Sequence, residues 1–428
     1  MDTPIPRLRS DLRITPFVEG PGGSRGKFLV EAGASCYTLN AAAHRVVVAM
    51  QENPASLGEL LERCNRGVEP AVGAEELRRL VWEQLPATLF AETPEVRRRT
   101  PFLVHATVLP EAVVAAASRR LTWLFTRPAA VVVLATFAVV LALSLPGGVS
   151  RSTHGMGTQA AVLLAFSLGS LAIHELGHAA ASSRFGCPPG PIGVAIYLLF
   201  PVMYTDVTRT WRLPPRQRAA VDLGGVYFQS ITASAAGLYA LATGSVFATW
   251  LMWMNAFSML HMLNPMYKLD GYWLLTDLSG LSNLHARMSA TLRALVSRPF
   301  RRRAAAPETG RVQGVVLYLY CILFTAYFAS VGRVLFTTAL ELARRYPPLA
   351  AASLARLDAA LRGGAALRAA SEAGHLALLT LGPLLTTVAL LFVARRAVLL
   401  FFPSTRKTRT SAPLSAAGVV PGLAKAGA

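Results

Sequence analysis

The stretch Thr158–Phe185 reads TQAAVLLAFSLGSLAIHELGHAAASSRF. As a helix it is long enough, at ~1.5 Å per residue, to cross a ~30 Å hydrocarbon core. His174 and His178 lie four residues apart, so they project from one helix face toward a common point, which is zinc-chelating geometry. Two His and the intervening Glu175 are costly inside a membrane unless they are paired or bind metal. The stretch therefore predicts a transmembrane helix that carries metal ligands.

The composition of the whole chain also favours a membrane protein. Of 428 residues, 53% are hydrophobic and only 15% are charged, against about 25% charged in a soluble domain. The net charge of +19 comes almost entirely from arginine. These arginines flank apolar spans, as at cytoplasmic membrane ends, and do not alternate with stacking aromatics. We therefore expect a lipid bilayer as a partner and no nucleic acid.

The cysteines and the N-terminus argue against two other features. The four cysteines show no paired spacing, which argues against a disulfide framework and a CxxC metal site. The N-terminal MDTPIPRLRSDLRITP has no apolar core, so we expect no cleaved signal peptide. The first ~115 residues are accordingly expected in the cytoplasm.

Residues 1–118 are predicted to form a small α+β, winged-helix-like domain. Extended stretches around Ile14–Glu19 and Lys27–Glu31 are separated by the turn-rich run Gly20–Gly26. Three short amphipathic helices are predicted after them. These helices cover Ala41–Met50, Leu57–Cys64 and Ala74–Leu85.

Residues 119–403 are predicted to form an all-α polytopic membrane domain of about six transmembrane helices, followed by a disordered cytoplasmic tail, 404–428. The apolar spans are Leu121–Leu145, Thr158–Phe185, Ala219–Ala242, Val246–Leu263, Val312–Thr337 and Gly374–Phe402. Arginine clusters between them predict a multi-pass inner-membrane protein with both termini cytoplasmic. Within the basic stretch 338–373, Glu341–Arg368 would be external and yet is rich in arginine, so we interpret it as an amphipathic interfacial helix.

A third metal ligand is predicted at Asp270. Pro265 and Gly271 break the chain just after the fourth span and aim this carboxylate back toward the bundle. The second and fourth spans both run inward, so the two His and Asp270 can meet on one side of the membrane. The alternative is that Asp270 caps an ordinary cytoplasmic turn.

At this point the sequence resembles the site-2 proteases, the zinc intramembrane metalloproteases, and most closely their bacterial branch of peptide zinc metalloproteases. The resemblance implies that His174, His178 and Asp270 bind one catalytic Zn²⁺ and that Glu175 is the catalytic base. It covers about 110 residues. The matching segments are His174–His178, Arg184–Gly186, Tyr197–Asp206, Trp211, Asn264–Asp277 and Asn283–Leu284.

Two departures from the family pattern concern substrate binding. The family's Asn three residues before the motif proline is Met262 here, and its Gly-Pro-x-x-Asn stretch is replaced by Gly224–Gln229. Asn264 and Gln229 are therefore candidate substrate-binding residues, or they form hydrogen bonds between helices. Tyr204 and Asp206 are further candidates, although Asp206 could instead pair with Arg209. Asp222 is expected to be a surface charge that faces Arg218.

The ligand set predicts peptide-bond hydrolysis. Zinc acidifies its bound water and polarises the scissile carbonyl, while Glu175 accepts the water proton and passes it to the leaving amine. The break at Pro188–Pro191 and the in-membrane extended segment Ile192–Tyr204 are expected to line a water path. By analogy with the family, this segment pairs with an unwound substrate strand.

The front domain resembles the pyrroloquinoline-quinone D type peptide chaperones, which bind leader peptides of ribosomally made natural products. The matching segments are Gly26–Val30, Tyr37–Ala43 and Pro54–Leu61. A short edge strand would offer its unpaired amides to a peptide. A DNA-binding winged helix or an inert folding module would give a similar pattern.

Together these features predict an intramembrane zinc metallopeptidase that cleaves a peptide precursor or a transmembrane substrate, in maturation of a ribosomally synthesised peptide. One alternative is cleavage of a membrane-bound regulator in signalling. Another is a non-hydrolytic factor for peptide export or immunity, against which Glu175 argues, because a metal scaffold needs no base. A transporter is disfavoured because no internal repeat is visible.

Overall fold

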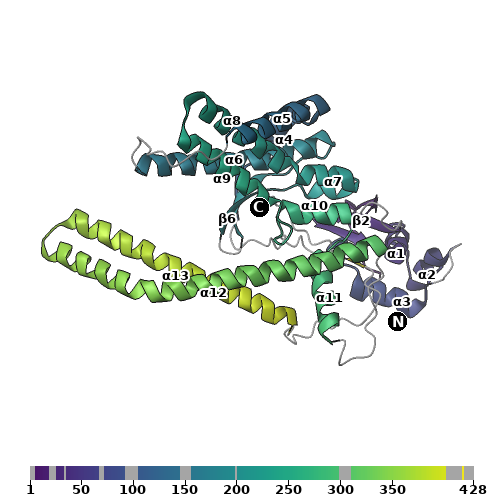
Figure 1. Cartoon of the computed structure of the whole chain (residues 1–428). Helices are drawn as coiled ribbons and strands as arrows, with labels where there is room; N and C mark the ends of the chain where they lie inside the picture. The colour runs from purple at the N-terminus through teal and green to yellow at the C-terminus, as the bar shows by residue number, and fades with distance from the viewer. Residues whose placement is uncertain are drawn as a thin grey trace. The chain divides into compact units, whose positions relative to one another are not determined.

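The computed structural model describes residues 5–18, 26–32, 35–66, 72–91, 105–144, 156–197, 200–297, 310–401 and 417–418. The chain is mostly helical, with a small sheet near its N-terminus, as Figure 1 shows. It divides into two compact units, Met1–Ser282 with Ala412–Ala428, and Asn283–Ser411. The predicted tail lies outside the described residues except for β7 (Ala417–Gly418).

The N-terminal module is an antiparallel sheet with three helices. Asn40 and Ser56 cap the first two helices, accepting hydrogen bonds from the backbone N–H of Ala43 and Glu59. Both predicted extended stretches and all three predicted helices are present, and a further strand, β3, follows β2. The elements are β1 (Arg13–Phe17), β2 (Lys27–Ala32), β3 (Ser35–Leu39), α1 (Ala41–Gln51), α2 (Leu57–Asn65) and α3 (Ala74–Arg79), in the sheet order β1-β2-β3-β7.

A second antiparallel sheet lies in the same unit, with strand order β4-β5-β6. Its strands are β4 (His105–Leu109), β5 (Ile192–Tyr197) and β6 (Phe200–Thr205). The predicted extended segment 192–204 is thus the β5–β6 hairpin, whereas β4 is an unpredicted partner. Among the described residues, β6 pairs with β5 alone, and no strand pairs with its other edge.

Helices α6 and α8 bring the candidate site together. A Cβ atom on Gly177 would lie 2.2 Å from the carbonyl oxygen of Gly224, so the two backbones can approach this closely only with glycine. The predicted third span is divided at Leu223 into α7 and α8. The helices of this unit are α4 (Glu111–Arg120), α5 (Arg127–Leu143), α6 (Met156–Arg184), α7 (Pro215–Asp222), α8 (Gly224–Thr243), α9 (Val246–Met262) and α10 (Asp270–Ser279).

A buried ion pair joins α7 to α10. The Arg218 Nε atom lies 2.8 Å from Asp277 Oδ1, and both side chains are 1% exposed. The expectation that Asp222 is a surface charge facing Arg218 is wrong, because Asp222 is buried and the guanidinium pairs with Asp277. The pair ties α7 to the helix that begins at Asp270.

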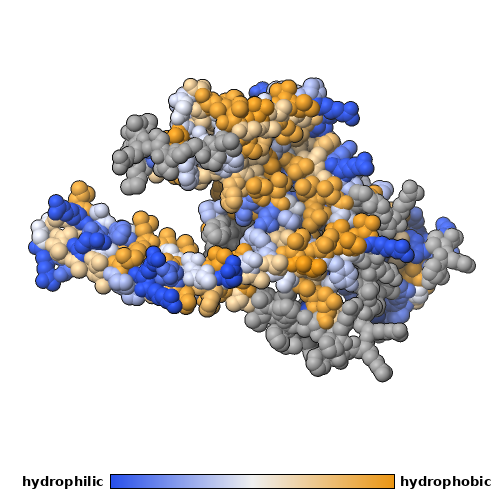
Figure 2. Space-filling view, in the orientation of Figure 1, coloured by the Kyte–Doolittle hydropathy of each residue, from blue (hydrophilic) through white to orange (hydrophobic). Residues whose placement is uncertain are grey.

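The second unit contains a long helical hairpin. Its helices are α11 (Leu284–Ser297), α12 (Arg311–Arg362) and α13 (Ala366–Phe401), and α12 packs along α13. The stretch Glu341–Arg368, interpreted as an interfacial helix, is mostly the continuation of α12, which runs through Pro347 and Pro348, and the chain turns only at Gly363–Ala365. Hydrophilic residues gather at the tip of this hairpin (Figure 2).

Among the described residues, three helices are long and apolar enough to cross a membrane. They comprise Thr158–Arg184, Arg311–Arg362 and Ala366–Arg395, and Arg127–Leu143 is a shorter apolar helix. The prediction of transmembrane helices is thus supported for three of the six spans. Within the described part of the chain, α8 and α9 do not meet the same criteria of length and hydropathy.

Candidate metal centre

The site is built around the middle of α6. His174 and Glu175 are completely buried, and His178 is 2% exposed. Asp270, also 2% exposed, is the first residue of α10. A Cβ on Gly271 would lie 2.0 Å from the carbonyl oxygen of Leu263, so only glycine lets the chain fold back tightly enough to place Asp270 here.

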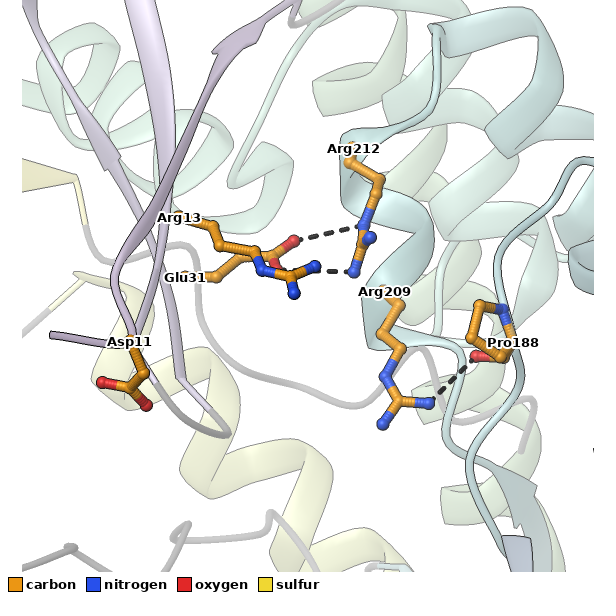
Figure 3. A pocket seen from close by; sticks show the side chains of 6 residues that line it. All are labelled: Asp11, Arg13, Glu31, Pro188, Arg209 and Arg212. Carbon is orange, nitrogen blue, oxygen red and sulfur yellow. Dashed lines mark hydrogen bonds and ion pairs between the residues drawn. The ribbon is translucent and has the colours of Figure 1, made fainter. Parts of the chain in front are cut away.

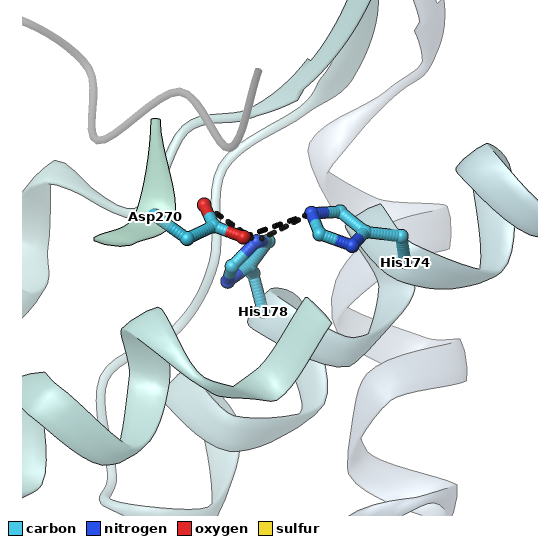
Figure 4. A group of neighbouring side chains, drawn as sticks. All are labelled: His174, His178 and Asp270. Atoms are coloured by element: carbon cyan, nitrogen blue, oxygen red, sulfur yellow. Dashed lines mark hydrogen bonds and ion pairs between the residues drawn. The ribbon is translucent and has the colours of Figure 1, made fainter. Parts of the chain in front are cut away.

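The three predicted ligands converge on one point, as Figure 4 shows. The Nε2 atoms of His174 and His178 lie 3.1 Å apart. Asp270 Oδ2 lies 3.1 Å from His174 Nε2, and Asp270 Oδ1 lies 3.4 Å from His178 Nε2. The group could hold a metal ion.

The outer ring nitrogens are held by fixed partners. His178 Nδ1 lies 2.8 Å from the carbonyl oxygen of Val221, which can only accept, so Nδ1 of the neutral ring carries the proton. His174 Nδ1 lies 3.0 Å from Gln229 Oε1, and Gln229 Nε2 donates to Asn255 Oδ1 at 3.3 Å. Because the Gln229 amide nitrogen donates to Asn255, its oxygen Oε1 faces His174 Nδ1 and accepts a hydrogen bond from it. Both inner Nε2 atoms therefore present lone pairs to the Asp270 carboxylate.

With both rings neutral, this cluster of electron pairs is one that a cation would satisfy. Two neutral imidazoles and a carboxylate supply acceptors and no proton between them, and buried acceptors without donors are costly. Asp270 Oδ2 and Glu175 Oε1 are both buried without a hydrogen-bond partner among the described residues. A divalent metal would satisfy the first and a water molecule bound to it would satisfy the second.

Glu175 is held by β6. Thr205 Oγ1 lies 2.7 Å from Glu175 Oε2 and 2.9 Å from the Glu175 carbonyl oxygen. Thr205 is itself fully buried at the end of β6. The hydroxyl therefore fixes one carboxylate oxygen and leaves the other available for chemistry.

The four candidate substrate-binding residues occupy different surroundings. Gln229 lies behind His174, whereas Asn264 Oδ1 accepts from the backbone N–H of Met266 within a local turn. Asp206 Oδ1 accepts from the N–H and hydroxyl of Thr208, while Arg209 pairs with Glu111. Tyr204 is buried on β6. Of these four residues, Gln229 is the one that is hydrogen-bonded to a predicted metal ligand, His174, in the contacts described here.

Three residues of the site escaped the sequence analysis. Thr205 lies in the segment Tyr197–Asp206, in which Tyr204 and Asp206 were predicted as site residues and Thr205 was not. Asn255 is a polar residue in an apolar helix, and that pattern could have identified it. Val221 acts through its backbone carbonyl, so its side chain gives no signal.

We expect Gly225→Ala to abolish metal binding. A Cβ at this position would lie 2.5 Å from the Nε2 atoms of His174 and His178, so the rings must move apart. Gly169→Ala is the matched control, because a Cβ there has nothing within 4 Å. Elemental analysis of the purified variants measures the effect, and full metal occupancy in the Gly225 variant would contradict the proposed geometry.

We expect Gln229→Leu to weaken metal binding by about 10- to 100-fold, the usual cost of losing the partner behind a ligating histidine. Gln229→Glu keeps an acceptor at the same place and should retain most of the affinity. Ser234→Ala is the control, since the Ser234 hydroxyl on the same helix bonds the backbone oxygen of Ser230. Competition with a chelator of known affinity gives the dissociation constants, and equal values for Gln229→Leu and the wild type would refute this role.

No family model, curated protein or solved structure matches the chain. The described geometry can hold a divalent cation beside an anchored carboxylate, within a helix that is long and apolar enough to span a bilayer.

Proposed function

We propose that this protein is an intramembrane zinc metallopeptidase of the site-2 protease type. The observation that carries the proposal is the convergence of His174, His178 and Asp270 next to the buried carboxylate of Glu175. The chain supplies three ligands and a base, which is the set that a catalytic zinc site needs when its fourth position is left to water.

The ligand spacing fits zinc. Tetrahedral ligands at ~2.0–2.1 Å from Zn²⁺ stand roughly 3.3 Å apart. The two Nε2 atoms lie 3.1 Å apart, and each lies 3.1 or 3.4 Å from a different oxygen of Asp270. With one ligand atom taken from each residue, the three atoms lie within 4.8 Å of one another. Imidazole nitrogen with carboxylate oxygen is also a donor set that zinc accepts readily.

Hydrolysis divides between the ion and the chain's own residues. A bound Zn²⁺ would polarise the scissile carbonyl and acidify a bound water. Glu175 Oε1 accepts the proton of the attacking water and passes it to the leaving amine. Thr205 keeps the Glu175 carboxylate in place, and Gln229 and the Val221 carbonyl hold the two rings in the required tautomer.

The edge of β6 that pairs with no described strand offers a place for the substrate. An extended peptide that pairs with this edge would expose its amide bonds, which a transmembrane helix hides. Thr205, at the end of the same strand, bonds to Glu175, so a paired peptide would run toward the base. This arrangement supports a role of the extended segment in substrate binding.

The exposed apolar surface supports a domain with about six membrane spans. Large hydrophobic side chains on helices α5, α8 and α9 are exposed, which is unusual for a protein in water. Examples are Val131 at 66%, Leu238 at 50% and Phe257 at 74%. These helices would contact lipid alongside α6, α12 and α13, in an inner-membrane protein with cytoplasmic termini.

The substrate class follows from the front module. Its resemblance to leader-peptide chaperones favours a ribosomally synthesised peptide precursor that residues 1–118 deliver to the membrane domain. Cleavage of a membrane-bound regulator would use the same site and chemistry.

The direct test is removal and return of the metal. We expect the purified protein in detergent to cleave an unfolded generic substrate such as casein, because strand pairing at β6 requires an extended chain. A zinc chelator should abolish this cleavage, and added Zn²⁺ should restore it. A protein that stays active after complete zinc removal would contradict the proposal, and a zinc-loaded protein with no cleavage would favour a non-hydrolytic role.

A further inference from the structure

We propose that a pocket between the N-terminal module and the β5–β6 region binds an acidic segment of the peptide substrate. The inference rests on the proposed peptide hydrolysis and names the chemical class of its substrate. The pocket has a volume of about 410 Å³. It is lined by Asp11, Arg13, Glu31, Pro188, Arg209 and Arg212, which Figure 3 shows.

The two walls of the pocket are fixed to each other. Glu31 of β2 forms an ion pair with Arg212, with 3.2 Å between Oε1 and Nε. On the neighbouring strand β1, the centroid of the Phe17 ring lies 6.3 Å from that of Trp211. The buried guanidinium of Arg218 lies over the Phe17 ring, 5.3 Å from the ring centroid. These contacts hold the pocket open as a preformed site, so a ligand need not order its walls.

The arginine side chains are prepared to receive a carboxylate. Arg209 is anchored by Glu111 at 2.7 Å and lies 3.4 Å from the Pro188 carbonyl oxygen, while Arg212 is anchored by Glu31. Each guanidinium has five N–H donors in a planar fork, and these bonds use only some of them. Anchored guanidinium groups with remaining donors favour bidentate binding of carboxylates.

Arg13 supplies the excess positive charge. Two of the pocket's arginines have acidic partners, as given above, and Asp11 is paired with Arg9 at 2.9 Å. Arg13 has no hydrogen bond or ion pair with any residue in the described part of the chain. It extends from β1 alongside Glu31 and toward Arg212 (Figure 3). One anionic group from a ligand would therefore neutralise the pocket.

The pocket lies close to the base of the β5–β6 hairpin. Pro188 lies at the start of the segment that leads into β5, and Arg209 follows Thr205 by four residues. The backbone of Gly190 is bonded to that of Asp206, which keeps the two segments together at the base of the hairpin. A peptide paired with β6 would thus place acidic residues in the pocket a few residues away from the cleaved bond.

The test is a charge exchange measured by binding. A fluorescent peptide with a run of glutamates is compared with the same peptide carrying glutamines or lysines, using full-length protein in detergent. We expect the wild type to bind the glutamate peptide tightest, with an affinity that falls as salt is added. Arg13→Glu should weaken that binding by about tenfold and improve binding of the lysine peptide, since it reverses one exposed charge.

Arg78→Gln, an exposed arginine on α3 of the same module, should leave both affinities unchanged. Equal binding of all three peptides, or an Arg13→Glu variant that binds like the wild type, would overturn the proposal. An Arg13 effect seen only with anionic lipid vesicles would also overturn it, in favour of a membrane contact. Repeating the measurement with Glu175→Gln separates this inference from the proposed hydrolysis, because binding does not require cleavage.

Discussion

Glu175→Gln is expected to retain its zinc and to lose peptide hydrolysis by roughly a hundred- to ten-thousandfold, the range in which general-base catalysis contributes. The amide keeps the size of the side chain and can still bond to Thr205, so the fold of the site should survive. It cannot accept the water proton, so the chemical step slows. Cleavage rate and zinc content, measured on the same preparation, give the two readouts.

The control for this variant is Glu76→Gln, an exposed change of the same chemical kind on α3. It should change neither rate nor zinc content. Unchanged processing by Glu175→Gln would eliminate Glu175 as the base. Loss of zinc in that variant would instead place Glu175 among the ligands, against the geometry in which only His174, His178 and Asp270 converge.

Asp270→Ala is expected to lose zinc itself. The change leaves two imidazoles without a carboxylate, so the affinity should fall by more than the roughly 10- to 100-fold that follows loss of a partner behind a ligand. It also removes the only negative charge among the three ligands. Activity should disappear with the metal, and elemental analysis after dialysis against a weak chelator measures the loss.

Asp358→Ala provides the comparison, because Asp358 is exposed on α12 and lies in the other compact unit. A fully zinc-loaded Asp270→Ala protein would show that the third ligand lies elsewhere. Circular dichroism and elution in size-exclusion chromatography confirm that the variant is folded before its zinc content is interpreted.

The three candidate ligands could be predicted from the sequence because their signals are local. His174 and His178 share a helix face by spacing alone, and Asp270 follows a proline and precedes a glycine. A side chain at position 271 would collide with the backbone of Leu263, which explains why glycine follows Asp270 at this break. Long apolar runs likewise predicted most of the helices, because the length of an apolar run can be counted directly in the sequence.

The features that could not be predicted depend on distant partners. Strand β4 has exposed residues throughout, so it lacks the alternation that marks a half-buried strand, and it exists because β5 supplies its hydrogen bonds. The break at Leu223 falls where α8 meets Gly177 of α6, a contact between residues far apart in the chain. Arg218 was given the wrong partner because Asp222 is close in sequence, whereas Asp277 is close in space.

Helix α12 shows that a span predicted from hydropathy can be part of a longer helix. The fifth span was predicted as Val312–Thr337, yet one helix runs from Arg311 to Arg362. Packing along α13 supplies contacts that a single-helix analysis omits. Tertiary contacts therefore override local preference here, as they commonly do.

The central claim is that two imidazoles and one carboxylate hold a single zinc ion, and X-ray absorption at the zinc edge of the purified wild-type protein tests it most directly. The account predicts about one zinc per chain with only nitrogen and oxygen ligands at ~2.0–2.1 Å and the scattering pattern of two imidazoles. Sulfur ligands at ~2.3 Å, or a protein that binds no zinc, would contradict it.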